Sequence, residues 1–366
     1  MKPQKDNLRF RDTNIADTAN LNALAQLTLN TELDDAFIRW KYFLNPAGIN
    51  YGRCAVSNGI PAGFFGNIPI NLHFGNEVIK CAQAVDAMVA PQFRRQGLFT
   101  ELGRQTYQKL DQDGITLTYT FPNPISEAGV LKHLDWMAVG RVPRYIKIID
   151  MDISLESNAK NTYKSLAYKI IQRLISHSKR KYITELSPKV RIRTEKYFDE
   201  RVNHLWLGVS ANLHICVVRD QVYMDWRYVK NPRQLYIILV AERGAELAGL
   251  LVLSFRDIET KKSAAIAEFM VLPGDQAAGS ALLREATILV KETGCAAVEC
   301  WMLPQHSFYT SLLRDSGFIF STKHYMPGLF KYTTPFIIRP HPRLQLSPDP
   351  RDIENWFLTM GDHDYY

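Results

Sequence analysis

The chain is short of cysteine and has no long apolar run. Its five cysteines are odd in number and scattered along 366 residues, which does not suit a disulfide framework. No Cys-x-x-Cys pair suggests zinc, and no apolar run approaches the roughly 18–20 residues that cross a bilayer. A secretory signal requires an apolar stretch after its basic start, and no such stretch follows the basic N-terminus here. We therefore predict reduced thiols, no metal and a cytoplasmic protein.

Composition and length favour a folded protein with two domains. Hydrophobic residues make up 46% and charged residues 22% of the chain, ordinary values for a soluble globular protein. Single domains commonly hold about 100–200 residues, so a chain of 366 residues is expected to form more than one.

The net charge of +7 is concentrated in one segment. Residues 160–196 contain eleven Lys or Arg and two acids, a local charge of +9, which leaves the rest of the chain close to −2. Residues 161–182 have helical apolar spacing, which predicts a basic linker helix. The alternatives are docking to an anionic membrane surface or to an acidic partner such as an acyl carrier protein. No nucleic-acid-binding motif accompanies the charge, so nucleic acid is not an expected partner.

The sequence repeats itself at a nearly constant offset, which is 186 residues at first and 182 further along. The matched pairs include Trp40 with Trp226, Asn45 with Asn231, Asp86 with Glu268, Val89 with Val271, Gly97 with Gly279 and Trp136 with Phe318. Colinear matches of this kind indicate a duplication. The two tryptophans are interpreted as core residues that survived it.

The first copy has alternating helix and strand patterns. Helical spacing covers residues 17–29 and 95–110, and strand-like runs cover 60–74, 78–89 and 115–121. This order predicts a sheet covered by helices.

The segment Val85–Leu102 resembles the acyl-CoA motif of the GNAT acyltransferase family, in which a strand ending in Val-x-Pro leads into a Gly-containing loop and a helix. Such a loop directs N–H groups and the positive end of the helix dipole toward a pyrophosphate. The predicted acyl-CoA-binding residues are Met88, Val89, Ala90, Arg94, Arg95, Gln96, Gly97, Leu98 and Phe99. Phe99 departs from the usual Gly or Ala. The resemblance implies an α/β fold of two tandem GNAT-like domains, each a mixed, mostly antiparallel sheet flanked by helices.

The resemblance also implies a mechanism and candidate catalytic residues. Backbone N–H groups near Met88 to Ala90 are expected to polarise the thioester carbonyl. In the family's second motif Asn123 is a candidate for orienting the acceptor, but Val130 and Leu131 stand where relatives carry a tyrosine that protonates the thiolate. Catalysis must then use another proton donor, solvent, or no proton donor at all. The weak candidates for the general base are Asp86, His73 and Glu127.

The C-terminal tail carries apolar and acidic residues together. After Lys331 it is too rich in proline for a predicted core element, yet Trp356, Phe357 and Leu358 are expected to dock. One hypothesis is that Asp362 and the candidate catalytic residue Asp364 hold an acceptor amine. The alternative is that the tail merely covers apolar surface.

The second copy's loop, residues 273–281, has no arginine, so it is predicted to be degenerate. The expected divisions are an N-terminal GNAT-like domain (1–152), a basic helical linker (153–198), a C-terminal GNAT-like domain (199–334) and a Pro-rich docking tail (335–366). The predicted function is N-acyl transfer from acetyl-CoA or another acyl-CoA to a small amine, such as an amino sugar or amino acid derivative. The alternatives are a non-catalytic ligand-binding scaffold and an acyltransferase that uses an acyl carrier protein as donor.

Overall fold

Contacts divide the chain into two units in a computed structural model that describes residues 8–149, 190–258, 261–320, 333–341 and 346–364. Unit 1 comprises Met1–Arg141, His214–Arg233 and Pro335–Trp356, and unit 2 comprises Val142–Leu213, Gln234–Thr334 and Phe357–Tyr366. Residues 214–233 therefore pack in unit 1, although they lie inside the range expected for the C-terminal domain. The expected domain ranges stay predictions.

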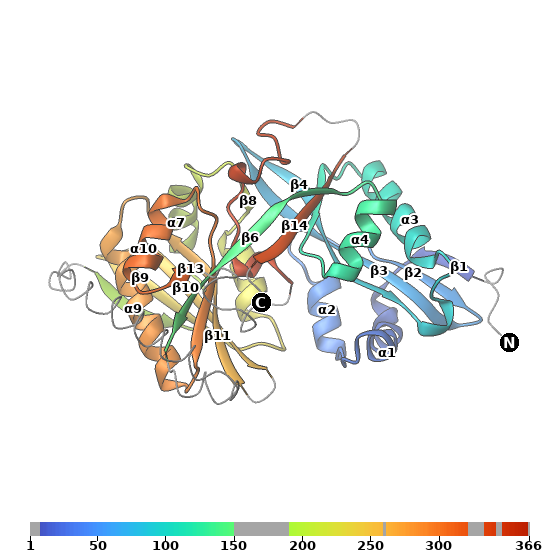
Figure 1. Cartoon of the computed structure of the whole chain (residues 1–366), viewed down its shortest axis with the longest axis horizontal. Coiled ribbons are helices and arrows are strands. Elements are labelled where there is room, and N and C mark those ends of the chain that lie inside the picture. Colours follow the sequence, from blue (N-terminus) through green and yellow to red (C-terminus); the bar gives the residue numbers. More distant parts are fainter. Residues whose placement is uncertain (1–7, 150–189, 259–260, 321–332, 342–345, 365–366) are drawn as a thin grey trace, which may run out of the picture. The chain divides into compact units, whose positions relative to one another are not determined.

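Unit 1 is built on a mixed sheet with the strand order β1-β2-β3-β4-β5-β14 (Figure 1). The strands are β1 (Leu8–Asp12), β2 (Arg53–Ser57), β3 (Ile60–Phe74), β4 (Glu77–Val89), β5 (Leu117–Thr120) and β14 (Thr333–Pro340). Neighbours pair antiparallel except β4 and β5, which are parallel. The short β8 (Ile215–Val217) pairs with the far end of β3.

Helices cover both faces of this sheet (Figure 1). They are α1 (Thr18–Leu29), α2 (Asp35–Phe43), α3 (Leu98–Gln112) and α4 (Pro124–His133). The Cα of Gly63 faces Leu98 and Leu102 of α3, whereas the ring of the next residue, Phe64, contacts Tyr42 of α2. Because successive side chains of a strand point to opposite faces, α2 and α3 lie on opposite sides of the sheet. The helix and strand patterns of the first copy are confirmed to within three residues.

The proline-rich stretch after Lys331 forms a core strand, so the expectation that it holds no core element was wrong. Phe336, Ile337 and Ile338 are fully buried in β14, which pairs with β5 over Ile337–Pro340. Prolines are tolerated here because they stand outside or at the end of the paired stretch. Pro335 precedes the paired residues and Pro340 ends them. The docking of Trp356, Phe357 and Leu358 is confirmed, since all three are buried.

Trp40 and Trp226 are core residues, as expected, and they contact each other within unit 1. The indole N–H of Trp40 donates to the Trp226 carbonyl at 2.7 Å, and the indole N–H of Trp226 donates to the Trp40 carbonyl at 3.1 Å. Their rings stack with centroids 5.0 Å apart. Trp40 belongs to α2, and Trp226 lies in a π-helical turn (Asp225–Val229) that follows α8 (Gln221–Met224). The repeated residues therefore make a reciprocal contact.

Unit 2 has a sheet of the same kind, with the order β6-β12-β11-β10-β9-β7. The strands are β6 (Met137–Ile148), β7 (Arg191–Glu195), β9 (Tyr236–Arg243), β10 (Glu246–Ile258), β11 (Lys261–Val271) and β12 (Ala297–Trp301), and the short β13 (Ile319–Phe320) pairs with β6. Among the described strands of this sheet, β11 and β12 pair in parallel and the other neighbours pair antiparallel. Its helices are α7 (Arg201–Ser210), α9 (Gln276–Glu292) and α10 (Ser307–Asp315). Two mostly antiparallel sheets flanked by helices are the predicted fold class.

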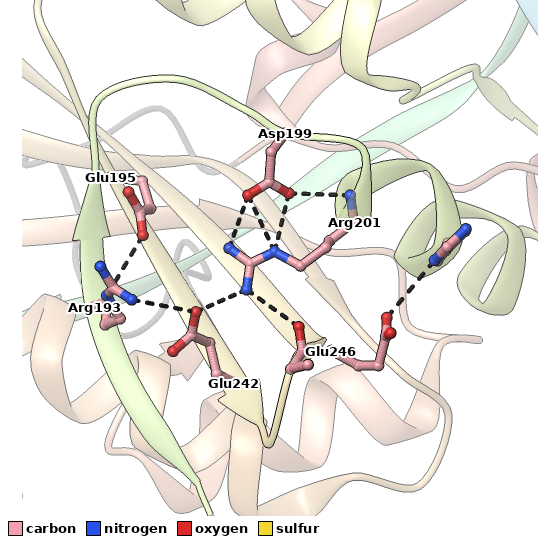
Figure 2. Close-up of polar contacts among 8 residues, drawn as sticks. Arg193, Glu195, Asp199, Arg201, Glu242 and Glu246 are labelled. Atoms are coloured by element: carbon pink, nitrogen blue, oxygen red, sulfur yellow. Dashed lines mark hydrogen bonds and ion pairs between the residues drawn. The ribbon is translucent and has the colours of Figure 1, made fainter.

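The edge of the unit 2 sheet is held by a charge network (Figure 2). Arg201, at the start of α7, donates to both carboxylate oxygens of Asp199 and, at 2.8 Å, to Glu242 of β9. Arg193 of β7 lies 3.6 Å from Glu195 and 3.8 Å from Glu242. Because the arginines and carboxylates of this network pair with each other, we interpret it as structural.

Residues 191–195, at the end of the range expected to be a helical linker, form strand β7 instead. In this strand the partly buried Ile192 stands between the exposed Arg191 and Arg193. Each residue of β7 pairs with a residue of β9. The predicted basic helix over 161–182 lies outside the described residues. All five cysteines are buried and none is in a disulfide bond, and burial raises the pKa of the Cys81 and Cys300 thiols. Among the described residues, no helix has the length and apolarity needed to span a membrane.

Candidate functional site

Strand β4 continues past the end of its parallel neighbour. The last paired residue of β4 is Gln83, opposite Tyr119, whereas β4 runs on to Val89. β5 ends at Thr120, so among the described strands none pairs with this side of β4 beyond Gln83. The sheet of unit 1 therefore opens beside the last residues of β4.

The open side of β4 presents the N–H of Val89. Ala90 donates its N–H to the carbonyl of Ala62, next to β3, at 2.9 Å. Successive N–H groups along a strand point to opposite sides, so the N–H of Val89 points away from β3. Of the three residues expected near the thioester, Val89 has the correctly directed donor, and that of Ala90 is already used. Met88 is buried.

A β-bulge precedes this residue. The register between β3 and β4 shifts between Phe64 and Gly66, so Asp86 and Ala87 together oppose Phe65. Asp86 has a left-handed backbone, with φ of 46°. Gly66 allows the close approach opposite the bulge, because a Cβ there would lie 2.8 Å from the Val85 carbonyl oxygen.

The loop after β4 leads to a helix start that no side chain caps. Gly97, with φ of 77°, is the N-cap residue of α3, and Arg95 is also left-handed, with φ of 59°. The first N–H groups of a helix have no partner within it, and together with the helix dipole they attract an anion. Arg94 and Arg95 are exposed at this loop, and Arg94 Nε donates to the Val89 carbonyl at 3.0 Å. Geometry and charge thus suit a pyrophosphate.

Phe99 fits the loop by turning toward the neighbouring helix. Its ring lies 5.4 Å from that of Phe65, and a Cβ on Gly129 of α4 would meet it at 3.3 Å. Leu98 is buried, and Gln96 donates from Nε2 to the Gln92 carbonyl at 3.0 Å. The bulky residue at the usual Gly or Ala position therefore packs between α3, α4 and the sheet.

The equivalent loop of unit 2 is closed by its own side chain. Helix α9 begins at Gln276, which corresponds to Arg94 at the 182-residue offset, so the residues that form the loop in unit 1 are helical here. Asp275 caps the helix by accepting from the N–H of Ala278 at 3.0 Å, and Arg243 donates to it at 2.7 and 2.8 Å. A carboxylate thus occupies the place that an anion would take.

The backbone donor of unit 2 is also engaged. Leu272 donates to Ala248 at 2.9 Å, which directs the N–H of Val271 away from β10. The Tyr309 hydroxyl of α10 lies 3.2 Å from this nitrogen and 3.2 Å from the Val271 carbonyl oxygen. It accepts from the first and donates to the second.

A cavity of about 530 Å³ lies elsewhere in unit 1. It is lined by the second half of α3, the turn after α4 and the end of β14, including Arg104, Tyr107, Asp111 and Arg339. Arg339 makes a double hydrogen bond to Asp111 at 2.8 and 2.7 Å. None of its lining residues belongs to the predicted acyl-CoA loop. Among the described residues, no group of three or more His, Cys, Asp or Glu is placed to hold a metal.

Comparison with known proteins agrees with this geometry. Residues 9–139 match the family model described as the acetyltransferase (GNAT) domain. No curated protein matches the chain by sequence. The matched residues lie in the first unit, which is thus similar to a GNAT acetyltransferase domain.

Solved structures share the fold over most of the chain. A GCN5-related N-acetyltransferase from Anabaena variabilis has a TM-score of 0.62 at 10% identity, over 91% of this chain and 73% of its own. Saccharomyces cerevisiae N-myristoyltransferase with bound myristoyl-CoA has a TM-score of 0.59 at 10% identity, over 92% and 79%. A probable N-acyltransferase from Enterococcus faecalis has a TM-score of 0.59 at 12% identity, over 91% and 72%.

Unit 1 places the predicted catalytic residue Asn123 directly before α4. Its side-chain oxygen accepts from the N–H of Ser126 at 2.9 Å, and its carbonyl accepts from Glu127 at 2.9 Å. Asn123 is exposed but serves α4 as a cap. Of the base candidates, Asp86 lies at the bulge, while His73 is on β3, opposite Cys216 of β8.

The acidic tail packs in unit 2. A 3₁₀ turn over Met360–Asp362 contacts β11, and Asp362 is buried and accepts from the N–H of Thr359 at 2.8 Å. Glu268 lies 3.4 Å from the Thr359 hydroxyl. The predicted catalytic residue Asp364 is partly buried, with an oxygen 3.3 Å from Nδ1 of His363. The structure thus places Asn123 in unit 1 and Asp364 in unit 2.

Two functional features escaped the sequence analysis. Tyr309 has the position of Glu127 at the 182-residue offset, in the helix where family tyrosines occur, and a search of the second copy would have found it. Asp275 directly precedes a helix, which is an N-cap signal.

Proposed function

We propose that the chain transfers an acyl group from acyl-CoA to an amine, with its donor site in the GNAT domain. The observation that carries the proposal is that unit 1 has both an uncapped α3 N-terminus and an outward-directed N–H at Val89. The two groups suit the two ends of an acyl-CoA donor, namely the pyrophosphate and the thioester carbonyl.

The residues of the loop have separable roles in this proposal. The N–H groups of the first turn of α3 and the guanidinium groups of Arg94 and Arg95 bind the pyrophosphate. The N–H of Val89 donates to the thioester oxygen, whose negative charge grows as the amine attacks. The amine must attack in its neutral form, so a base has to accept its proton. Asn123 orients the acceptor.

For the donor we favour acetyl-CoA, and for the acceptor a small amine such as an amino sugar or amino acid derivative. The myristoyl-CoA bound in the yeast N-myristoyltransferase structure makes a longer acyl chain the alternative donor. That Asp364 contacts an acceptor amine stays a prediction, and Asp362 is buried and accepts from the Thr359 N–H within its own turn. Removal of the residues after Met360 tests this role, because unchanged acceptor affinity would contradict it.

A non-catalytic acyl-CoA-binding protein is the second candidate. It is favoured by α4, in which no tyrosine is present to protonate the departing thiolate. Mass spectrometry of an amine panel incubated with acetyl-CoA separates the two, since only the enzyme yields an acylated amine and free CoA. A carrier-protein donor is tested in the same assay with an acylated carrier in place of acetyl-CoA.

Calorimetric titration with acetyl-CoA tests the site itself. We expect one donor per chain and at least tenfold weaker binding in Arg94→Ala, because a charge-assisted contact to phosphate contributes about 1.5–3 kcal/mol. Gln276→Ala is the matched control, since Gln276 has the equivalent position in unit 2 and lies within helix α9. Two sites per chain, or loss of binding in Gln276→Ala alone, would contradict this assignment.

A further inference from the structure

Asp86 is held by two side chains of one helix. Lys41 Nζ lies 2.6 Å from Asp86 Oδ2, and the Tyr42 hydroxyl donates to the same oxygen. The Lys41 and Asp86 side chains are only 5% and 8% exposed. Both partners come from α2, on the face of the sheet opposite to α3.

The conformation of Asp86 is uncommon. Few residues other than glycine have a positive φ, although aspartate and asparagine adopt it more readily than most, and the contacts from Lys41 and Tyr42 hold Asp86 in this conformation. The bulge at Asp86 sets the direction of the next three residues of β4, including Val89. Two further fixed points define the bulge: Gly66 opposite it and the Ala90 to Ala62 hydrogen bond after it.

Helix α2 is itself fixed by the residue next to Lys41. Trp40 exchanges two hydrogen bonds with Trp226, from the second copy of the repeat, and stacks on it. Three consecutive residues thus connect the Trp226 turn to the bulge: Trp40 on one side, and Lys41 and Tyr42 on the other.

We infer that Lys41, Tyr42 and Asp86 are positioning residues that aim the Val89 N–H at the acyl carbonyl. This inference rests on the proposed donor site. It assigns Asp86 to the alignment of the donor rather than to the general base, because its carboxylate is already committed to an ammonium and a phenol. It also gives the second copy a role, since Trp226 anchors the helix that carries Lys41 and Tyr42.

The test compares acetyl-CoA with ethyl-CoA, a thioether that lacks the carbonyl oxygen and keeps the rest of the molecule. Wild type is expected to bind acetyl-CoA more tightly. In Asp86→Asn and Lys41→Met we expect this preference to fall by about tenfold, the size of one hydrogen bond, with ethyl-CoA affinity unchanged. Asparagine tolerates the left-handed backbone, so Asp86→Asn removes the charge while keeping the shape.

An infrared measurement separates a misdirected Val89 N–H from a general loss of structure in the variants. The infrared stretch of a ¹³C-labelled acetyl carbonyl shifts to lower frequency when it accepts a hydrogen bond, and the variants should lose that shift. Tyr42→Phe removes one hydroxyl only and serves if the other variants fail to fold. Asp17→Asn is the matched control, since Asp17 also forms a close ion pair within unit 1, with Arg11 at 2.6 Å, but belongs to the turn Ile15–Asp17 before α1 and not to β4.

The outcomes distinguish this inference from the proposed function. Folded variants that keep both the preference and the carbonyl shift would overturn the inference and leave the donor site standing. A wild type that binds both compounds equally would also overturn it. A wild type that binds neither would overturn the proposed donor site and the inference with it.

Discussion

The ends of strands β4 and β11 have equivalent places in the sheets of the two units and differ in the groups that occupy them. Both strands outrun a parallel neighbour, and both turn one N–H, that of Val89 or Val271, toward the open side. In unit 1 the adjacent helix starts at an uncapped Gly97. In unit 2 Asp275 caps the helix and Tyr309 engages Val271.

This contrast shows that two sheets of the same kind can differ in whether their own side chains engage these backbone groups. A helix N-terminus and an outward N–H are costly to leave unsatisfied in a buried setting. Unit 2 satisfies both with its own side chains. In unit 1 no side chain caps α3, and Lys41 and Tyr42 instead hold Asp86 in the bulge that precedes Val89, as the proposed donor site requires.

The largest expected effect comes from removing the donor itself. Val89→Pro deletes an N–H that is not used in pairing with β3. We expect the acylation rate to fall by about 10²–10³, as for loss of one oxyanion donor, with a smaller change in donor affinity. Val271→Pro is the matched control and should leave the rate unchanged. Equal losses in both variants, in chains that remain folded, would break the comparison.

A smaller effect is expected when unit 1 is given the unit 2 arrangement. Gly97→Asp places a carboxylate at the start of α3, as Asp275 does for α9. Its charge competes with a phosphate for the same N–H groups, so CoA affinity should fall by tenfold or more. Gly97→Asn controls for the added side chain and any backbone strain, because asparagine matches aspartate in size and in its tolerance of a positive φ but carries no charge. Similar losses in both variants would assign the effect to strain.

Local sequence patterns predicted much of this candidate site, but the contacts between residues far apart in the chain were not predicted. Periodicity located α1, α3, β3 and β4, and the Gly-containing loop located the helix start, because these signals lie within a few neighbouring residues. The strand character of residues 336–338 depends on β5, more than 200 residues earlier in the chain. Lys41 and Asp86 are 45 positions apart, so nothing local pairs them.

Tyr309 should matter for stability and not for turnover. In Tyr309→Phe the buried N–H of Val271 loses its acceptor, which costs about 1–3 kcal/mol of unfolding free energy. Thermal unfolding measures this change, and the acylation rate should stay at the wild-type value. A large loss of rate with unchanged stability would instead make Tyr309 a catalytic acid and place a working site in unit 2.

The smallest effect concerns the charge on Asp275. Asparagine caps a helix as well as aspartate does, so Asp275→Asn isolates the ion pair with Arg243, which is worth about 0.5–1 kcal/mol at this partly exposed position. The Arg243 guanidinium lowers the pKa of the Asp275 carboxyl below its ordinary 3.8. A carboxyl whose pKa is lowered in the folded state stabilises the fold above its unfolded pKa, and this stabilisation is lost as pH falls through the folded value. The difference in unfolding temperature between wild type and Asp275→Asn should therefore be constant near neutral pH and shrink below about pH 3.8. A difference that persists in acid would mean that the stabilisation by Asp275 does not depend on its charge, and that charge does not distinguish the start of α9 from that of α3.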